Sequence, residues 1–227
     1  GKEVSRDRVL GNDEIKAVWN AFDKLGWPFG PAFKLLLITG QRRDEVATMR
    51  WRDVDLKAAL WTLPRESTKA DRMNEVPLSP LALEVLGSVK RTSKEYVFST
   101  NGETPISGFS KAKGRAELII AMERLEATGK AKPTAKQINK AKLPDWRLHD
   151  LRRTLASNMA KSDVAPHIVE KVLNHSTGEI SGVAAVYNRY AYTDEKRVAL
   201  VAWAENLESI VAVSEADNMV ELRGDTS

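Results

Sequence analysis

The sequence of 227 residues contains no cysteine and only three histidines. The absence of cysteine excludes disulfides, thiolate metal ligands and a cysteine nucleophile, and it fits a reducing cytoplasm. The histidines His149, His167 and His175 do not have the spacing of zinc ligands, so we expect no metal site and no other cofactor. We interpret His167 as a surface residue.

Long apolar runs are absent as well. The longest, around residues 35–38, is far too short to cross a bilayer, and no signal peptide is visible. The first residue is Gly1 rather than Met, so we interpret the chain as a fragment in which residues 1–11 are a linker or an artificial remnant. We therefore expect a cytoplasmic protein without a membrane partner.

The excess of positive charge is small. A net charge of +4 permits nucleic-acid binding without establishing it. Basic residues are concentrated between positions 111 and 142, where nine lysines or arginines accompany three glutamates. Such a run is either a solvated helix face or a surface for the DNA backbone. The nine are Lys111, Lys113, Arg115, Arg124, Lys130, Lys132, Lys136, Lys140 and Lys142.

Hydrophobic periodicity predicts an α+β fold that is mainly α-helical. Expected helices cover residues 12–25, 31–39, 43–50, 80–90, 109–128, 149–161, 166–174, 183–190 and 194–213. The period changes between residues 54 and 79, where short apolar runs flank a polar hairpin over residues 64–75. We expect a small antiparallel sheet of two to three strands there. Residues 130–145 are expected to form an exposed basic connection, and residues 214–227 a flexible tail.

The segment TGQRRDEV places Arg42 at the beginning of a helix, directly after Gly40. A helix N-terminus presents free N–H groups and a positive potential, which favours an anion. Glu45 lies three residues on, on the same helix face, where its carboxylate can orient the guanidinium of Arg42. The alternative is a surface arginine paired with a surface glutamate.

The segment HDLRRT places His149 and Arg152 three residues apart, so both project from one helix face. Alone, this pair could be a capping histidine and a solvated arginine, and Arg153 could be structural or a DNA-backbone contact. His175 ends a predicted helix, whose C-terminus favours the protonated imidazole. His175 could therefore donate a hydrogen bond to an oxyanion, or it could simply cap the helix.

Three tyrosines, Tyr187, Tyr190 and Tyr192, lie within six residues of one another. Composition and periodicity do not separate them, and an aromatic residue at such a position commonly belongs to the core. Lys69 and Arg72 lie in the predicted hairpin, where a lysine is usually solvated, and either of them could contact a phosphate.

In their order, the segments TGQRRDEVATMRW, RLHDLRRT and AVYNRY resemble the catalytic domain of a tyrosine recombinase of the phage integrase type. The resemblance covers residues 12–207 and implies a catalytic domain over residues 12–213, with the helical fold of DNA breaking-rejoining enzymes. The N-terminal DNA-binding domain typical of the family is not in this sequence. Tyr187 lies twelve positions after His175, a few more than is usual, and LNH replaces the commoner LGH.

The resemblance also implies roles for individual residues. Tyr187 becomes the nucleophile, and the product is a 3′-phosphotyrosine that allows strands to be rejoined without metal or ATP. The arginines and His175 stabilise the transition state, His149 is the general base and Lys69 protonates the leaving group. The implied catalytic residues are Arg42, Lys69, His149, Arg152, His175 and Tyr187, supported by Glu45. Candidate DNA contacts are Arg43, Arg72, Lys111, Lys113, Arg115 and Arg153.

The implied activity is site-specific integration or excision of a prophage or genomic island. The implied partner is double-stranded DNA. The free protein is expected to be a monomer and to assemble as a homotetramer on the DNA. DNA-bending or excision factors are further partners that the resemblance allows. The C-terminal helix with Leu200, Trp203 and Leu207 packs either on a neighbouring subunit or on its own domain. Alternatives are a chromosome-dimer resolvase, a mobile-element transposase, a DNA-binding module without catalysis, and a helical interaction domain.

Overall fold

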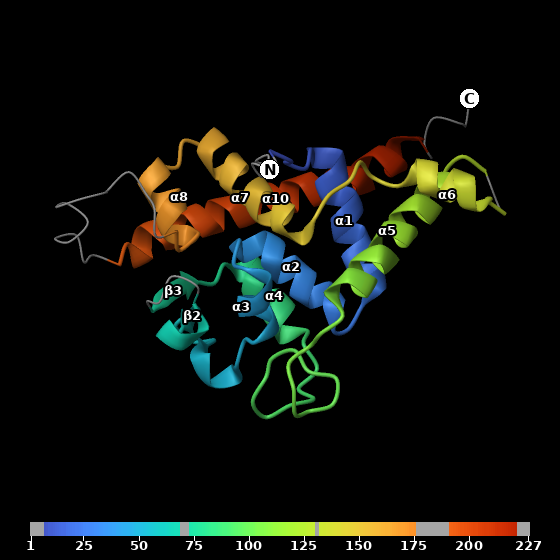
Figure 1. The fold of residues 1–227 in the computed structure, drawn as a ribbon. Coiled ribbons are helices and arrows are strands. Elements are labelled where there is room, and N and C mark those ends of the chain that lie inside the picture. Colours follow the sequence, from blue (N-terminus) through green and yellow to red (C-terminus); the bar gives the residue numbers. More distant parts are fainter. Residues whose placement is uncertain (1–6, 69–72, 130–131, 176–190, 222–227) are drawn as a thin grey trace, which may run out of the picture.

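A computed structural model describes residues 7–68, 73–129, 132–175 and 191–221. This part of the chain is mainly helical and carries one small antiparallel sheet, which confirms the predicted fold class (Figure 1). The α-helices are α1 (Asn12–Leu25), α2 (Phe29–Thr39), α3 (Arg43–Ala47), α4 (Pro80–Gly87), α5 (Phe109–Glu126), α6 (Ala135–Ala141), α7 (Leu148–Lys161), α8 (Pro166–Val172) and α10 (Thr193–Glu221). The strands are β1 (Val54–Asp55), β2 (Leu60–Leu63) and β3 (Asn74–Pro77).

Helix α2 is the centre of the core. Its residues from Leu35 to Ile38 are at most 2% exposed, because α1, α4, α7 and α10 surround it (Figure 1). A helix that is apolar on every side is stable only when it is enclosed in this way. α2 ends at Gly40, which has a left-handed backbone with φ of 65°. Glycine adopts this conformation without steric cost, so the chain can turn at once into Gln41 and Arg42.

The sheet has the strand order β1-β2-β3, and both pairings are antiparallel. Trp61 of β2 lies opposite Val76 of β3, and Leu63 lies opposite Asn74. Trp61 and Leu63 are buried while their neighbours are partly exposed, because alternate side chains of a strand point to opposite faces. One face of the sheet therefore covers the helical core, as expected for residues 54–79.

The predicted helix over residues 43–50 is too long. α3 ends at Ala47, because the backbone that follows pairs with a distant segment instead of continuing the helix. The oxygen of Met49 accepts a hydrogen bond from the nitrogen of Val97 at 2.8 Å, and the nitrogen of Trp51 donates to the oxygen of Glu95 at 2.9 Å. These long-range bonds compete with the last helical turn, and sequence periodicity does not reveal them.

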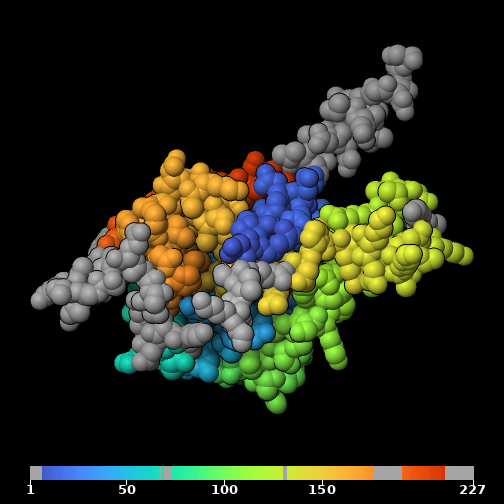
Figure 2. Space-filling view, turned by 45° about the horizontal axis from the view of Figure 1, so that its top comes forward, coloured from blue at the N-terminus to red at the C-terminus, as the bar shows by residue number. Residues whose placement is uncertain are grey.

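Helix α5 packs against α1, and its C-terminal end together with α6 lies at the edge of the molecule (Figures 1 and 2). α6 begins at a capping box in which Thr134 and Gln137 each bind the backbone of the other, and none of its seven residues is buried. The exposed basic connection predicted for residues 130–145 therefore contains one short helix. Lys132, before this helix, and Lys136, within it, are both exposed.

Helix α10 packs within its own chain. Leu200, Trp203 and Leu207 are at most 3% exposed, and the indole Nε1 of Trp203 donates to the backbone oxygen of Leu37 in α2 at 3.0 Å. The helix continues to Glu221, beyond the predicted end at residue 213. Among the helices that the structure describes, none combines the length and apolar character needed to span a bilayer.

Candidate functional site

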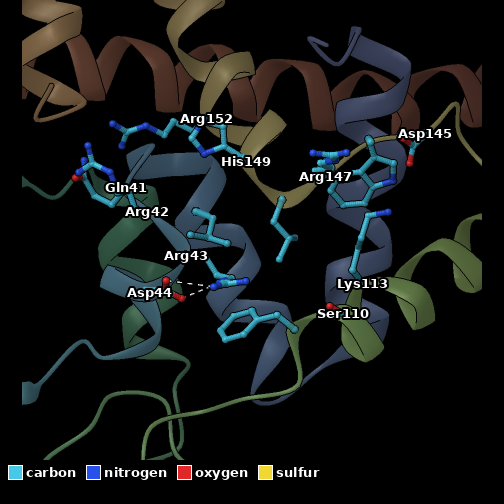
Figure 3. Close-up of a pocket in the computed structure, with 14 residues that line it drawn as sticks. Gln41, Arg42, Arg43, Asp44, Ser110, Lys113, Asp145, Arg147, His149 and Arg152 are labelled. Atoms are coloured by element: carbon cyan, nitrogen blue, oxygen red, sulfur yellow. Dashed lines mark hydrogen bonds and ion pairs between the residues drawn. The ribbon is translucent and has the colours of Figure 1, made fainter. Parts of the chain in front are cut away.

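Three segments far apart in the sequence, the turn after α2, the start of α5 and the start of α7, meet at one hollow of about 640 Å³. The turn after α2 supplies Arg42, and the first two turns of α7 supply His149 and Arg152 (Figure 3). His175 follows on the turn after α8, whose carbonyl oxygens accept hydrogen bonds from both arginines. Four of the predicted catalytic residues are thus brought together by the packing of α2, α7 and α8.

Arg42 is held by a buried carboxylate. Glu45 is 3% exposed; its Oε2 accepts a hydrogen bond from the Arg42 backbone nitrogen at 2.7 Å and its Oε1 from Nη1 at 3.0 Å. The Nη2 group of Arg42 donates to the oxygen of Asn174 at 3.4 Å. The alternative of a surface ion pair is therefore wrong, and Glu45 orients the guanidinium as predicted.

Arg152 is almost completely buried, with 3% of its surface exposed. Its Nη1 donates to the oxygen of Gly40 at 2.5 Å and its Nη2 to the oxygen of Leu173, so the guanidinium joins the end of α2 to the turn after α8. Burial and the neighbouring Arg42 lower the pKa of Arg152 to about 10, which leaves it positively charged at neutral pH. The alternative of a solvated arginine is wrong.

His149 is the second residue of α7 and is exposed at the hollow. Burial first, and then the charges of Arg153 and Arg152, lower the pKa of His149 below its ordinary value. An imidazole in this environment is neutral at neutral pH and can accept a proton. These are the properties that a general base needs.

His175 is bound to the last turns of α8 through both its backbone and its ring. Its backbone nitrogen donates to the oxygen of Glu170 at 3.1 Å, and its Nδ1 lies 2.7 Å from Glu170 Oε2. Burial and the charges of Arg152 and Arg42 lower the pKa of His175, while Glu170 raises it. The preceding residue, Asn174, has a left-handed backbone with φ of 48°, which ends the helix and turns the chain toward the arginines.

Among the candidate DNA contacts, Arg43 and Lys113 line the same hollow. Arg43 binds Asp44 at 2.7 Å and lies over the ring of Phe109. Lys113 pairs with Glu117, four residues on, and its ammonium lies 4.8 Å from the ring centroid of Trp146. The two cations are therefore held in place while their outer faces remain accessible.

The other candidates lie elsewhere in the fold. Lys111 and Arg115 are exposed on α5 and are not part of the hollow. Arg153 binds the fully buried carboxylate of Asp150 at 2.6 Å, which favours its structural interpretation over a DNA contact. Lys69, Arg72, Tyr187 and Tyr190 lie outside the described residues.

Three polar residues at the site were not singled out from the sequence. Arg147 lines the hollow and is exposed, opposite Arg42 and Arg152 in Figure 3. Gln41 is 2% exposed, and its Nε2 donates at 2.9 Å to the oxygens of Thr39 and of Val172. Gln41 and Arg147 belong to the segments TGQRRDEV and RLHDLRRT, so their closeness in sequence to Arg42 and His149 could have identified them. Glu170 lies outside these segments, and nothing in the sequence identified it.

Tyr192 is the one member of the tyrosine group within the described residues. Its ring lies 5.6 Å from that of His167 and 5.2 Å from the ammonium of Lys171, so it packs against α8. It is not among the residues that line the hollow. In the part of the chain that the structure describes, no group of three His, Asp or Glu side chains is arranged to hold a metal ion.

Comparison with known proteins identifies the family of the chain. The family model described as "Phage integrase family" matches residues 8–194. Prophage integrase IntF of Escherichia coli K12 is 27% identical over 182 residues, which cover 77% of this chain and 34% of IntF. Prophage integrase IntZ of the same strain is 28% identical over 205 residues, covering 88% and 44%. The chain thus spans less than half the length of these relatives.

A structural relative supports the fold. The Tn1549 transposon integrase, solved in complex with a circular intermediate DNA, matches with a TM-score of 0.58 and 14% identity over 86% of this chain and 66% of that chain. At this level of identity the likeness concerns the fold alone.

Proposed function

The chain belongs to the phage integrase family, and we propose that it is the DNA-cleaving and rejoining domain of a tyrosine-type site-specific recombinase. The activity is the integration or excision of a prophage or genomic island. The observation that carries the proposal is the pair of positively charged side chains, Arg42 and Arg152, fixed on buried supports beside two histidines. Such an arrangement fits a phosphodiester that gains negative charge during reaction.

The two arginines are oriented before any substrate binds. Arg42 is held by Glu45, and Arg152 by two backbone oxygens. Their proximity lowers the pKa of Arg152, which means that the charges repel each other. A phosphate between them removes this repulsion and accepts hydrogen bonds from both guanidinium groups. The two arginines therefore favour binding of the scissile phosphate between them.

We assign the reacting groups as follows. The phenol oxygen of Tyr187 attacks phosphorus, and its proton passes to the neutral imidazole of His149. The bond from phosphorus to the 5′ oxygen breaks, and Lys69 protonates that oxygen. The product is a 3′-phosphotyrosine with a free 5′-hydroxyl. The reverse attack by a 5′-hydroxyl rejoins a strand without ATP, because the phosphoester link is conserved.

The DNA backbone is proposed to run along the hollow. Arg43, Lys113 and Arg147 line it together with the catalytic arginines, so they are suited to phosphates next to the scissile one. Arg72, Lys111 and Arg115 are proposed as further contacts. We also propose that the free protein is a monomer that forms a homotetramer on double-stranded DNA, assisted by DNA-bending or excision factors.

The test uses the full-length protein and a nicked duplex that carries the attachment site found at the junctions of its element. Cleavage next to the nick traps the covalent adduct, which a denaturing gel separates. We expect an adduct with wild type and with the matched control Tyr192→Phe, and none with Tyr187→Phe. An equal adduct with Tyr187→Phe would make the nucleophile assignment wrong. Binding without any wild-type adduct would favour a DNA-binding module without catalysis.

A further inference from the structure

Glu170 lies outside the predicted catalytic set, yet its carboxylate contacts the ring of His175. We propose that Glu170 is a positioning residue, which fixes the Nδ1 proton of His175 and favours the protonated imidazole, so that Nε2 donates a hydrogen bond to the scissile phosphate once the phosphate is bound. The proposal rests on the proposed function, because it assigns the task of His175 within it.

The geometry determines which ring nitrogen carries a proton. Glu170 Oε2 lies 2.7 Å from His175 Nδ1, and the two side chains are 34% and 36% exposed. An ionised carboxylate only accepts hydrogen bonds, so the proton is on Nδ1. The backbone bond from the His175 nitrogen to the Glu170 oxygen, 3.1 Å long, prevents the two residues from separating. The ring orientation is therefore set by Glu170.

Fixing Nδ1–H alone does not make His175 a donor toward a phosphate. In the neutral imidazole with the proton on Nδ1, Nε2 is an acceptor, and its lone pair would repel a phosphate oxygen. Nε2 can donate only when the ring carries both protons. His175 is therefore useful at the proposed site only as an imidazolium.

The surrounding charges work against this protonated form. Burial has the largest effect, and the charge of Arg152 on α7 adds to it, as does that of Arg42 on the turn before α3; all three lower the pKa of His175. Among the residues that the structure describes, Glu170 on α8 raises it, through its charge and its hydrogen bond. Glu170 thus offsets the two arginines that the site needs for other reasons.

A phosphate bound at the site further favours the protonated form of His175. Its negative charge offsets Arg42 and Arg152, and the ring then lies between two anions, Glu170 at Nδ1 and the phosphate at Nε2. A carboxylate that orients an imidazole and stabilises its charged form has the same physical effect in other hydrolytic and transfer sites. The acidic partner here lies in α8, five positions before the histidine that follows on the turn after this helix.

The first experiment observes the histidine directly. Nitrogen NMR of the full-length protein, labelled at histidine and assigned with His175→Gln, reports the tautomer and the pKa of His175. We expect Nδ1–H in the neutral ring of wild type. Glu170→Gln keeps an acceptor but removes the charge, and it should lower the pKa of His175. An unchanged pKa, or a proton on Nε2 in the neutral ring of wild type, would overturn the proposal.

The second experiment measures the rate of covalent adduct formation against pH. The rate should fall as pH rises through the pKa of His175, and in Glu170→Gln this fall should begin at lower pH. A pKa lowered by about one unit reduces the protonated fraction about tenfold above both pKa values, and hardly at all below them. A merely structural role would reduce the rate by the same factor at every pH. Glu170→Asp should recover part of the wild-type profile.

Controls separate the two proposals. Glu84→Gln removes one exposed negative charge on α4 and should leave both the pKa and the pH profile unchanged. If His175→Gln abolishes cleavage while Glu170→Gln has a wild-type profile, the positioning role fails and the proposed function stands. If no adduct forms under any condition, the proposed function fails, whereas the NMR result still decides whether Glu170 controls His175.

Discussion

Arg152 donates a hydrogen bond from Nη1 to the backbone oxygen of Gly40, 2.5 Å away and 112 positions earlier in the sequence. A second bond reaches Leu173, so one guanidinium closes the gap between α2 and the turn after α8. The side chain that is proposed to bind the phosphate is therefore also part of the framework that holds the site together.

Replacing Arg152 by lysine should weaken both roles. An ammonium group retains the charge but lacks the planar fork that reaches two carbonyl oxygens at once. Loss of one buried, charge-assisted hydrogen bond should lower the free energy of unfolding by about 1–3 kcal/mol. Urea denaturation measures this change. Arg147→Lys, at an exposed position, should lie within about 0.5 kcal/mol of wild type; an equal loss in both variants would contradict the structural role.

Removing the carboxylate charge of Glu45 should release Arg42. Glu45→Gln keeps one acceptor oxygen, so either the backbone nitrogen or Nη1 of Arg42 loses its partner. We expect a loss of about 1–3 kcal/mol in the free energy of unfolding and slower adduct formation. Asp44→Asn is the control, because its side chain is 76% exposed and its ion pair contributes little. An equal loss in Glu45→Gln and Asp44→Asn would contradict the role of the buried carboxylate.

Acidification should destabilise the fold through the two site histidines. Both His149 and His175 have a lowered pKa in the folded state. As the pH falls through the ordinary histidine pKa of about 6.5, the unfolded chain therefore binds more protons than the folded one. The free energy of unfolding decreases as the pH is lowered. Melting temperatures from pH 7.5 to 5.5 test this. The decline should be shallower in His149→Gln, and an identical slope would contradict the lowered pKa.

Trp203 should act as a core residue of its own chain. Trp203→Phe removes the indole donor to Leu37 and leaves unfilled volume beside α2. We expect a loss of about 1–3 kcal/mol in the free energy of unfolding at any protein concentration. Val198→Ala on the same helix, 71% exposed, should change it by less than about 0.5 kcal/mol. A loss that depends on protein concentration would instead indicate contact with another subunit.

DNA binding should respond to Arg147 as to a phosphate contact. Arg147→Gln removes an exposed cation from the hollow and should weaken binding equally for different sequences. The slope of log affinity against log salt should decrease by about 1. Lys57→Gln, exposed in the turn between β1 and β2, should leave the slope unchanged. A loss confined to one base sequence would mean that Arg147 reads bases.

The local parts of this site were predictable from the sequence. His149 and Arg152 are three residues apart on a helix, so their common face follows from helical geometry alone. The contact of Arg42 with Glu45 follows in the same way, from a separation of three residues at a helix start. In each case the interacting groups lie within one helical turn.

What could not be predicted depends on partners distant in the sequence. The carbonyl oxygens that hold Arg152, and the pairing of residues 95–97 that ends α3, exist only once the chain is folded. Glu170 was missed for a different reason. It lies in a half-exposed helix with no feature that separates it from a solvated glutamate, and only the turn at Asn174 brings His175 back to it.

Gly40 links the packing of the core to the position of Arg152. A Cβ atom at this position would lie 3.1 Å from the side chain of Leu155 and 3.3 Å from that of Leu173, on a backbone that already favours glycine. The peptide would have to move, and its oxygen is the acceptor of Arg152. A larger side chain at this position would therefore displace the guanidinium of Arg152 without contacting it, unless Leu155 and Leu173 became smaller at the same time.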